Sequence, residues 1–226
     1  MSNQFLWVIF PYLCMATFVV GHIFRYRNDQ FGWTAKSSEF IEKKQLMIGS
    51  LLFHIGIMPV IAGHIAGLGI PKEWTRAVGI SDSMYHMGAV WGGGFFGVVT
   101  FLGMLILTWR RFALKRVREL SSISDLIVNS LLLFIVFIGM YSVIGTSVTQ
   151  PEFDYRDSIS VWFRSLLIFR PDASFMSSVP IAFQLHLLSG FLIFAMWPFT
   201  RLVHVWSVPL NYFGRSYILF RRDRSE

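Results

Sequence analysis

Four histidines lie inside apolar stretches of the chain. His54 and His64 are ten residues apart, and His186 and His204 are eighteen apart. An imidazole surrounded by hydrocarbon is costly unless it has a partner, so histidines inside membrane-spanning segments are usually functional. Imidazole nitrogens are also common axial ligands of haem iron. The residue types therefore predict metal ligation, and the alternative is that each histidine hydrogen-bonds to a neighbouring backbone carbonyl.

The elements that must position these histidines are long apolar helices. Hydrophobic residues make up 54% of the 226 residues, charged residues 15%, and the mean hydropathy is +0.54. A helix that crosses the hydrocarbon core needs about 20 mostly apolar residues. Period-two alternation of the kind that marks a membrane β-barrel is missing from the sequence. We predict an all-α membrane protein forming one domain, 1–226, with helices over about 5–24, 46–68, 87–108, 126–148 and 180–206.

The basic residues indicate the orientation of these helices. Of the twenty basic residues, fifteen lie in the loop after the first helix, the loop after the third helix and the C-terminal segment. The other five lie on the opposite side. This positive-inside bias predicts an N-terminus outside and a C-terminus in the cytoplasm. The net charge of +7 therefore reflects membrane topology, and no basic-aromatic element indicates nucleic-acid binding.

Topology also predicts how the histidines pair. The second and fifth helices run in opposite directions, which places His64 near His186 at the outer side and His54 near His204 at the cytoplasmic side. Two imidazole pairs at two depths suit two six-coordinate b-type haems between these helices. A haem with both axial positions filled has no open site for oxygen chemistry, so the predicted role is electron transfer.

The unequal spacings require a bend in at least one helix. Ten residues span about 15 Å of helix and eighteen span about 27 Å, and eighteen residues are five whole turns. Pro59 is expected to kink the second helix, and Pro198 can do the same in the fifth. Gly49, Gly56 and Gly63 recur every seven residues and favour either a flat macrocycle or close helix packing.

Other residues are weaker candidates. His86 opens the third helix on the outer side, where an imidazole could accept a proton from a quinol. Arg110 and Arg111 end that helix on the cytoplasmic side, as ligands of haem propionates or as topogenic charges. His22 is expected at the membrane interface, and Cys14 as an inert apolar side chain. The segment 149–179, with an amphipathic run at 161–169, is expected on the membrane surface or over the quinol site.

Four stretches around these residues resemble one known family. The sequence resembles the gamma subunit of the respiratory nitrate reductases, which is a membrane cytochrome b, over nearly its whole length. The stretches are RYRNDQFGWTAKSSEF (25–40), FHIGIMPVIAGH (53–64), FQLHLLSG (183–190) and WPFTRLVHVWSVPLNY (197–212).

The resemblance implies specific residue roles. It implies haem ligation by His54 with His204 and by His64 with His186, the pairing that topology also predicts. In the family a basic residue before a methionine contacts quinol at the start of the third helix, and His86 holds that position here. Some members have lysine there, so the contact in this chain is expected to be pH-sensitive or different in kind. Gly63, beside His64, falls in the same quinol pocket of relatives.

The resemblance also implies a mechanism and partners. Quinol, either menaquinol or ubiquinol, is oxidised near the outer haem, and its protons are released outside. Electrons pass through the two b haems to an iron–sulfur beta subunit, and then to a molybdenum-containing alpha subunit that reduces nitrate. The expected location is the cytoplasmic membrane of a bacterium or archaeon, in anaerobic respiration or nitrate assimilation. The basic loops and the tail 212–226 are expected to dock the partner.

Two alternatives come from other functional assignments. A haem b subunit of a related quinol-oxidising complex would keep both sites but deliver electrons to a different terminal acceptor. A transporter or a membrane anchor would carry no haem. The sequence has neither the buried acid–base pairs nor the inverted repeats typical of transporters.

Overall fold

The computed structural model describes residues 4–33 and 39–207. Five helical segments within these ranges are long and apolar enough to cross a membrane, which confirms the predicted number. They are Phe5–Asn28, Lys44–Gly69, Asp82–Ala113, Ile123–Thr149 and Ile181–Phe199. Strands are absent from the described part of the chain.

Three of these segments change helix type along their length. The first is a π-helical turn, η1 (Phe5–Ile9), followed by α1 (Phe10–Asn28). The second and third are α2 (Lys44–Gly69) and α4 (Asp82–Ala113). The fourth joins α6 (Ile123–Met140), a π-helical turn η2 (Tyr141–Gly145) and α7 (Thr146–Thr149). The fifth joins α9 (Ile181–Met196) and a 3₁₀ turn, η4 (Trp197–Phe199).

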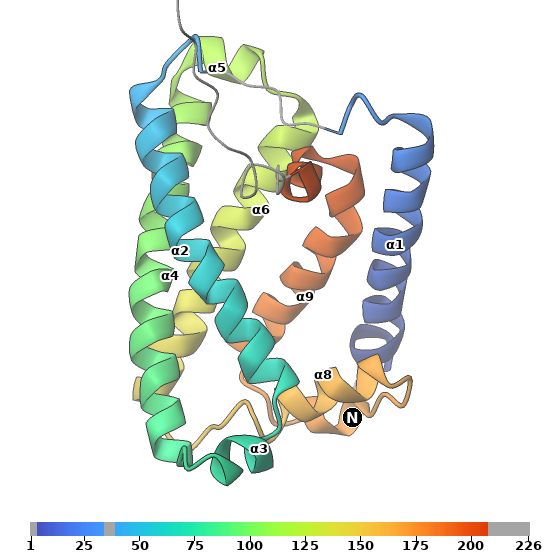
Figure 1. The fold of residues 1–226 in the computed structure, drawn as a ribbon, viewed down its shortest axis with the longest axis vertical. Helices are drawn as coiled ribbons and strands as arrows, with labels where there is room; N and C mark the ends of the chain where they lie inside the picture. The colour runs from blue at the N-terminus through green and yellow to red at the C-terminus, as the bar shows by residue number, and fades with distance from the viewer. Residues whose placement is uncertain (1–3, 34–38, 208–226) are drawn as a thin grey trace, which may run out of the picture.

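Shorter helices lie at the two ends of this bundle (Figure 1). We call one end the α8 end, because it carries α8 (Ile159–Leu167) together with α3 (Lys72–Ala77) and the 3₁₀ turn η3 (Ala173–Met176). We call the other the α5 end, because it carries α5 (Lys115–Glu119). The last described element, the 3₁₀ helix η5 (Arg201–Ser207), also lies there (Figure 1).

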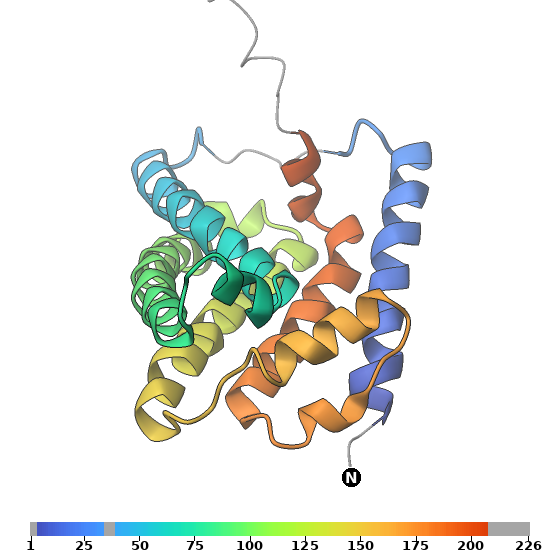
Figure 2. The same ribbon diagram turned by 60° about the horizontal axis from the view of Figure 1, so that its bottom comes forward.

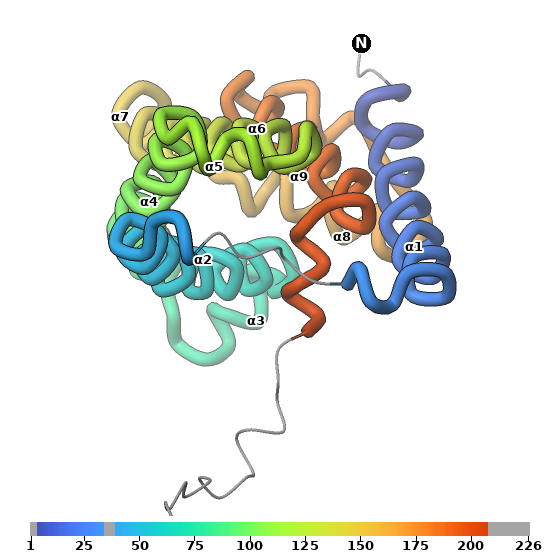
Figure 3. Tube along the Cα trace, turned by 90° about the horizontal axis from the view of Figure 1, so that it is seen from above, coloured from blue at the N-terminus to red at the C-terminus, as the bar shows by residue number. Residues whose placement is uncertain are grey.

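The five long helices form an open arc rather than a closed ring. α2 packs on α4, α4 on α6, α6 on α9, and α9 on α1 (Figure 3). Within the described residues, α2 and α9 share no extensive packed interface, although they face each other across the arc. The second and fifth long helices therefore pack on other helices rather than on each other.

Small residues explain the close contact of α2 with α4. A Cβ on Gly56 would lie 2.6 Å from the backbone nitrogen of Thr100, and a Cβ on Gly103 would lie 2.8 Å from the carbonyl of Gly49. Gly49 and Gly56 therefore serve helix packing, the second of the two roles predicted for the glycines that recur every seven residues. A Cβ on Gly63 would meet nothing within 4 Å, so the third of these glycines borders open space.

The segment 149–179 forms a covering layer at the α8 end (Figure 2). The indole of Trp162, on α8, is fully buried, and its Nε1 donates a 2.9 Å hydrogen bond to the carbonyl of Trp7. Tyr12 donates a 2.9 Å hydrogen bond to the carbonyl of Leu166. α8 thus packs against the ends of α1 and α2 as part of the main apolar core.

The fifth helix, predicted over about 180–206 with Pro198 as a site for a kink, is interrupted at Thr200. α9 tightens into a 3₁₀ turn at Pro198, and Thr200 is extended, with φ −127° and ψ 177°, before η5 begins. Proline lacks the backbone N–H that a continuing helix needs. His186 and His204 therefore do not lie on one face of a single helix, and the break sets the position of His204.

Candidate functional site

The four histidines predicted as ligands face each other in two pairs. The ring centroids of His54 and His204 are 6.3 Å apart, with an angle of 74° between the ring planes. Those of His64 and His186 are 5.8 Å apart, with an angle of 35°. The pairs join α2 with η5 near the α5 end, and α2 with α9 near the α8 end. The structure thus brings together the same partners that topology predicts.

Each imidazole uses one nitrogen to hold its orientation. Nδ1 lies 2.8 Å from the carbonyl of Ser50 in His54, 2.7 Å from that of Val60 in His64, and 2.7 Å from that of Arg201 in His204. In His186 the partner is the carbonyl of Ile135, at 3.0 Å. A carbonyl only accepts hydrogen bonds, so Nδ1 carries the proton and Nε2 keeps a lone pair. The alternative drawn from the sequence, a carbonyl-bound histidine, thus describes only one nitrogen of each ring.

The two pairs fit a metal held between two imidazoles. Metal–imidazole bonds are about 2 Å long, so one metal atom between two rings separates their centroids by about 6 Å. Within the described residues, no group of three or more His, Cys, Asp or Glu side chains could hold a metal ion. Ligand sets of two suit haem, because the porphyrin supplies the other four nitrogens.

The exposure of α2 agrees with this fit. Only 11% of its most apolar 18-residue window is buried within the chain, against 22% in each of the other four spans. His54 and His64 are themselves exposed. Exposed imidazoles at these depths need a polar or metal partner, because hydrocarbon cannot satisfy Nε2.

The amino-acid sequence was compared with family models and with known proteins, and both comparisons find matches over nearly the whole chain. The family model described as nitrate reductase gamma subunit matches residues 3–223. The nitrate reductase gamma chain of Bacillus subtilis is 48% identical over 222 residues, covering 98% of this chain and 99% of that one. The respiratory nitrate reductase 2 gamma chain of Escherichia coli is 39% identical, covering 98% of both chains. The chain also matches about a third (34%) of the nitrate reductase-like protein NarX of Mycobacterium tuberculosis, at 39% identity.

This chain belongs to the nitrate reductase gamma subunit family. It is therefore a component of an oxidoreductase complex, and the name of the family implies further nitrate reductase subunits as partners. The predicted resemblance is confirmed over almost the full length of the chain.

Around the histidine pairs of this gamma subunit, the predicted quinol residues lie toward the α8 end. Gly63 adjoins His64 and borders open space. His86 is exposed near the start of α4. The role of both residues in binding quinol stays a prediction.

The two arginines of the gamma subunit predicted near haem propionates have protein partners. The buried Arg110 donates from Nε to Glu42 Oε2 at 2.9 Å and from Nη2 to the Glu42 carbonyl at 2.7 Å. Arg111 donates from Nη1 to Ser121 Oγ at 2.7 Å. The backbone amide of Gln45, together with Arg110, holds the pKa of Glu42 below its usual range. Arg110 thus ties the end of α4 to the start of α2, and a propionate contact stays a prediction.

Sequence reasoning missed the groups that position His204. His22, expected at the membrane interface, accepts at Nε2 a 3.0 Å hydrogen bond from Trp206 Nε1, 184 residues away. Arg25 Nη1 donates to the carbonyls of Pro198 and Thr200, at 2.7 and 3.0 Å. These are carbonyls at the break between α9 and η5, so α1 holds the segment that carries His204. The only signal in the sequence is the proline itself.

Sequence reasoning also missed the groups that hold the end of α2 after His64. Three carbonyls at the C-terminal end of α2 accept hydrogen bonds from side chains of α8 and the loop before it. Ser160 donates to Gly67 at 2.8 Å, Arg164 to Leu68 at 3.2 Å, and Arg156 to Ile70 at 3.2 Å. These bonds satisfy carbonyls that a helix end leaves without partners.

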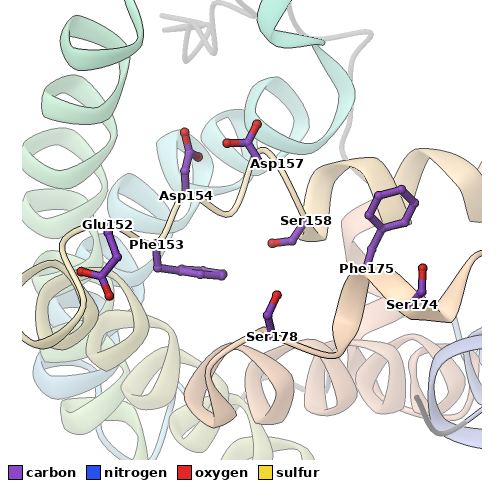
Figure 4. A pocket seen from close by; sticks show the side chains of 8 residues that line it. All are labelled: Glu152, Phe153, Asp154, Asp157, Ser158, Ser174, Phe175 and Ser178. Atoms are coloured by element: carbon purple, nitrogen blue, oxygen red, sulfur yellow. The ribbon is translucent and has the colours of Figure 1, made fainter. Parts of the chain in front are cut away.

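An acidic pocket of about 380 Å³ opens at the α8 end (Figure 4). Glu152, Asp154 and Asp157 lie around it, with serine and phenylalanine side chains. Lys72 Nζ lies 2.7 Å from Asp154 and 2.6 Å from Asp157. Burial opposes the charge of Lys72, but the two carboxylates raise its pKa. Two of the three carboxylates thus share a single ammonium partner.

Proposed function

We propose that this gamma subunit is the dihaem cytochrome b subunit that oxidises quinol for a respiratory nitrate reductase. The observation that supports it best is the two histidine pairs, each with its Nδ1 atoms on carbonyls and its Nε2 atoms free. His64 and His186 would hold one haem b toward the α8 end, and His54 and His204 the other toward the α5 end. When bound, the two haems would supply a path for single electrons through the hydrocarbon core.

The sides of the membrane follow from the charge distribution. The α5 end carries the basic ends of α1 and α4 and the basic helix α5. The positive-inside rule therefore favours the cytoplasm for the α5 end and the outside for the α8 end. In this orientation quinol oxidation at the α8 end releases protons outside, with His86 accepting a proton and Gly63 leaving room for the quinol ring. Separation of charge across the membrane would follow.

The partners at the α5 end would be an iron–sulfur beta subunit and, beyond it, a molybdenum-containing alpha subunit. The relatives found by comparison are nitrate reductase proteins, which favours nitrate over another terminal acceptor. The tail 212–226, predicted to dock the beta subunit, lies outside the described residues.

A redox-titrated visible spectrum of the purified complex tests the proposal. We expect two low-spin b haems per gamma chain. His64→Ala should remove the redox component of one haem and His54→Ala that of the other, because each substitution deletes one axial ligand. Gly88→Ala serves as a control, since a Cβ at Gly88 meets nothing within 4 Å and the residue lies outside the histidine pairs.

One haem or none in the unsubstituted complex would contradict the assignment. Loss of the same component in both histidine variants would contradict the pairing. Retention of both haems in either variant would show that the substituted histidine is not a ligand.

A further inference from the structure

His186 differs from the other three histidines in how its ring is held. The Nδ1 atoms of His54, His64 and His204 bind carbonyls three or four residues earlier in the chain. The Nδ1 of His186 instead lies 3.0 Å from the carbonyl of Ile135, which belongs to α6 and is 51 residues away in sequence. The orientation of three rings is thus set by their own helix, whereas that of His186 is set by a neighbouring helix.

The ring of His186 also lies against the backbone of α6. Gly139 follows Ile135 by four residues and so shares its face of the helix. A Cβ added to Gly139 would lie 2.6 Å from Cε1 and 2.9 Å from Nδ1 of His186. Both distances are far shorter than a non-bonded contact between heavy atoms, which is about 3.5–4.0 Å. Only glycine at position 139 therefore allows the imidazole to lie where the Ile135 carbonyl can hold it.

Together the two α6 groups constrain the ring in different ways. The Ile135 carbonyl selects the tautomer with the proton on Nδ1, which leaves the lone pair on Nε2. The bare backbone at Gly139 lets the ring approach α6 and sets its distance from His64, whose ring centroid is 5.8 Å away.

We propose that Gly139 and the carbonyl of Ile135 are positioning groups that orient His186 as an axial ligand. α6 carries no predicted ligand of its own, yet it decides the geometry of the haem site at the α8 end. The inference rests on the proposed function, because it takes His186 to be a ligand of haem iron.

Electron paramagnetic resonance of the oxidised complex tests this inference, because the signal of a low-spin ferric haem depends on how its two axial imidazole planes are oriented. In Gly139→Ala we expect the signal of one haem to shift or disappear, with a shifted reduction potential or a fall in haem per gamma chain from two toward one. The component that changes should be the one that His64→Ala removes. The component that His54→Ala removes should stay as in the unsubstituted complex, and Gly88→Ala should leave both unchanged.

An unchanged spectrum in Gly139→Ala, with two haems in the unsubstituted complex, would overturn the inference and leave the proposed function intact. The absence of haem from the unsubstituted complex would instead overturn the proposed function. The two failures are therefore distinguishable.

A double substitution covers the case in which Gly139→Ala does not accumulate. Removing the ring in His186→Ala leaves nothing for the added methyl group to strike. If the inference holds, Gly139→Ala lowers accumulation and melting temperature in the unsubstituted chain but has little further effect in His186→Ala. An equal loss in both backgrounds would show that the methyl group clashes with something other than the imidazole, and would overturn the inference.

Discussion

At the scale of single residues, the site depends on which nitrogen of each imidazole the protein occupies. Backbone carbonyls bind Nδ1 in all four paired histidines, which leaves the Nε2 lone pair available. Backbone acceptors need no additional polar side chain inside the membrane, where such groups are costly. The same arrangement occurs in His22. Its Nδ1 lies 2.6 Å from the carbonyl of Phe18, and its Nε2 accepts a hydrogen bond from Trp206 Nε1. A carbonyl on Nδ1 therefore does not by itself distinguish a ligand; the paired histidines differ from His22 because each has a second imidazole ring within 6.3 Å.

His86 provides a test of quinol chemistry at this scale. We expect His86→Leu to lower quinol-dependent nitrate reduction about 100-fold, because a positioned proton acceptor typically contributes at least that factor. Turnover driven by a soluble dye that reduces the complex directly should be unchanged, as should the haem spectrum. His86→Lys is the matched variant, and it should retain most of the quinol-dependent rate. Full quinol-dependent activity in His86→Leu would remove this residue from the proposed site.

Glu42 gives a pH-dependent prediction. Its pKa is lowered by the amide of Gln45 and by Arg110, so the folded state favours the carboxylate. The stabilisation is present above the ordinary pKa of glutamate, roughly 4.3, and is lost as the pH falls through the lower pKa of the folded state. The melting temperature of Glu42→Gln in detergent should therefore lie below that of the unsubstituted protein at pH 7, with a difference that shrinks in acid. Glu39→Gln, at an exposed pair with Lys43, is the control, and a difference independent of pH would argue against the account.

At the scale of elements, each helix that carries histidines is held by neighbours at its ends. α2 is fixed at its start through Glu42 and Arg110 and at its finish by Ser160 and Arg164. The fifth span is held differently, because its break at Pro198 exposes carbonyls that α1 then binds. The exact positions of the four paired histidines thus depend on elements that carry none of them.

Arg25 tests this dependence. Arg25→Met removes the donor to the carbonyls of Pro198 and Thr200, and we expect a loss of about 1.5–3 kcal/mol in stability, the usual value for hydrogen bonds to a charged group. The haem signal assigned to His54 and His204 should also broaden, because η5 is less firmly held. Unfolding in denaturant and the spectrum of the complex check the two effects. Arg27→Met is the control, because Arg27 lies two residues further along the chain and is exposed. Equal effects in both variants would contradict the role of Arg25 in holding η5.

At the scale of the whole molecule, the basic side chains at the two ends of the bundle differ in their partners. Four basic side chains at the α8 end bind groups of the chain. Lys72 pairs with two aspartates and Arg76 with Asp82, whereas Arg156 and Arg164 donate to carbonyls. At the α5 end the side chains of Lys43 and Lys115 are 72% and 80% exposed, and each has a carboxylate partner four residues away, Glu39 before α2 and Glu119 on α5. This asymmetry is consistent with the α5 end in the cytoplasm.

Cysteine labelling checks the orientation. In a Cys14→Ala background, Glu152→Cys should react with a membrane-impermeant maleimide in intact cells, because Glu152 is exposed at the α8 end. Lys115→Cys, at an 80% exposed side chain of the α5 end, should not react until the membrane is opened. The reverse pattern would invert the proposed topology and with it the side on which protons are released.

The sequence by itself determined the number of spans, their antiparallel order and the partners within each histidine pair. These follow from hydropathy and the alternation of helix direction, which are properties of local composition. The four ligand candidates could also be named, because polar groups in long apolar runs are rare. The roles of Gly49 and Gly56, by contrast, stayed open between haem and helix packing until the contacts with α4 were known.

Only the tertiary structure decided how the rings are held and where the fifth span breaks. Whether Pro198 bends or interrupts a helix depends on which groups donate hydrogen bonds to the carbonyls near it. The donor here is Arg25, which lies 173 residues away from Pro198 in the sequence. The carbonyl of Ile135 and the bare backbone of Gly139 meet His186 across two helices. Such contacts leave no local periodicity in the sequence, because a backbone carbonyl is present at every residue and only packing decides which one a side chain meets.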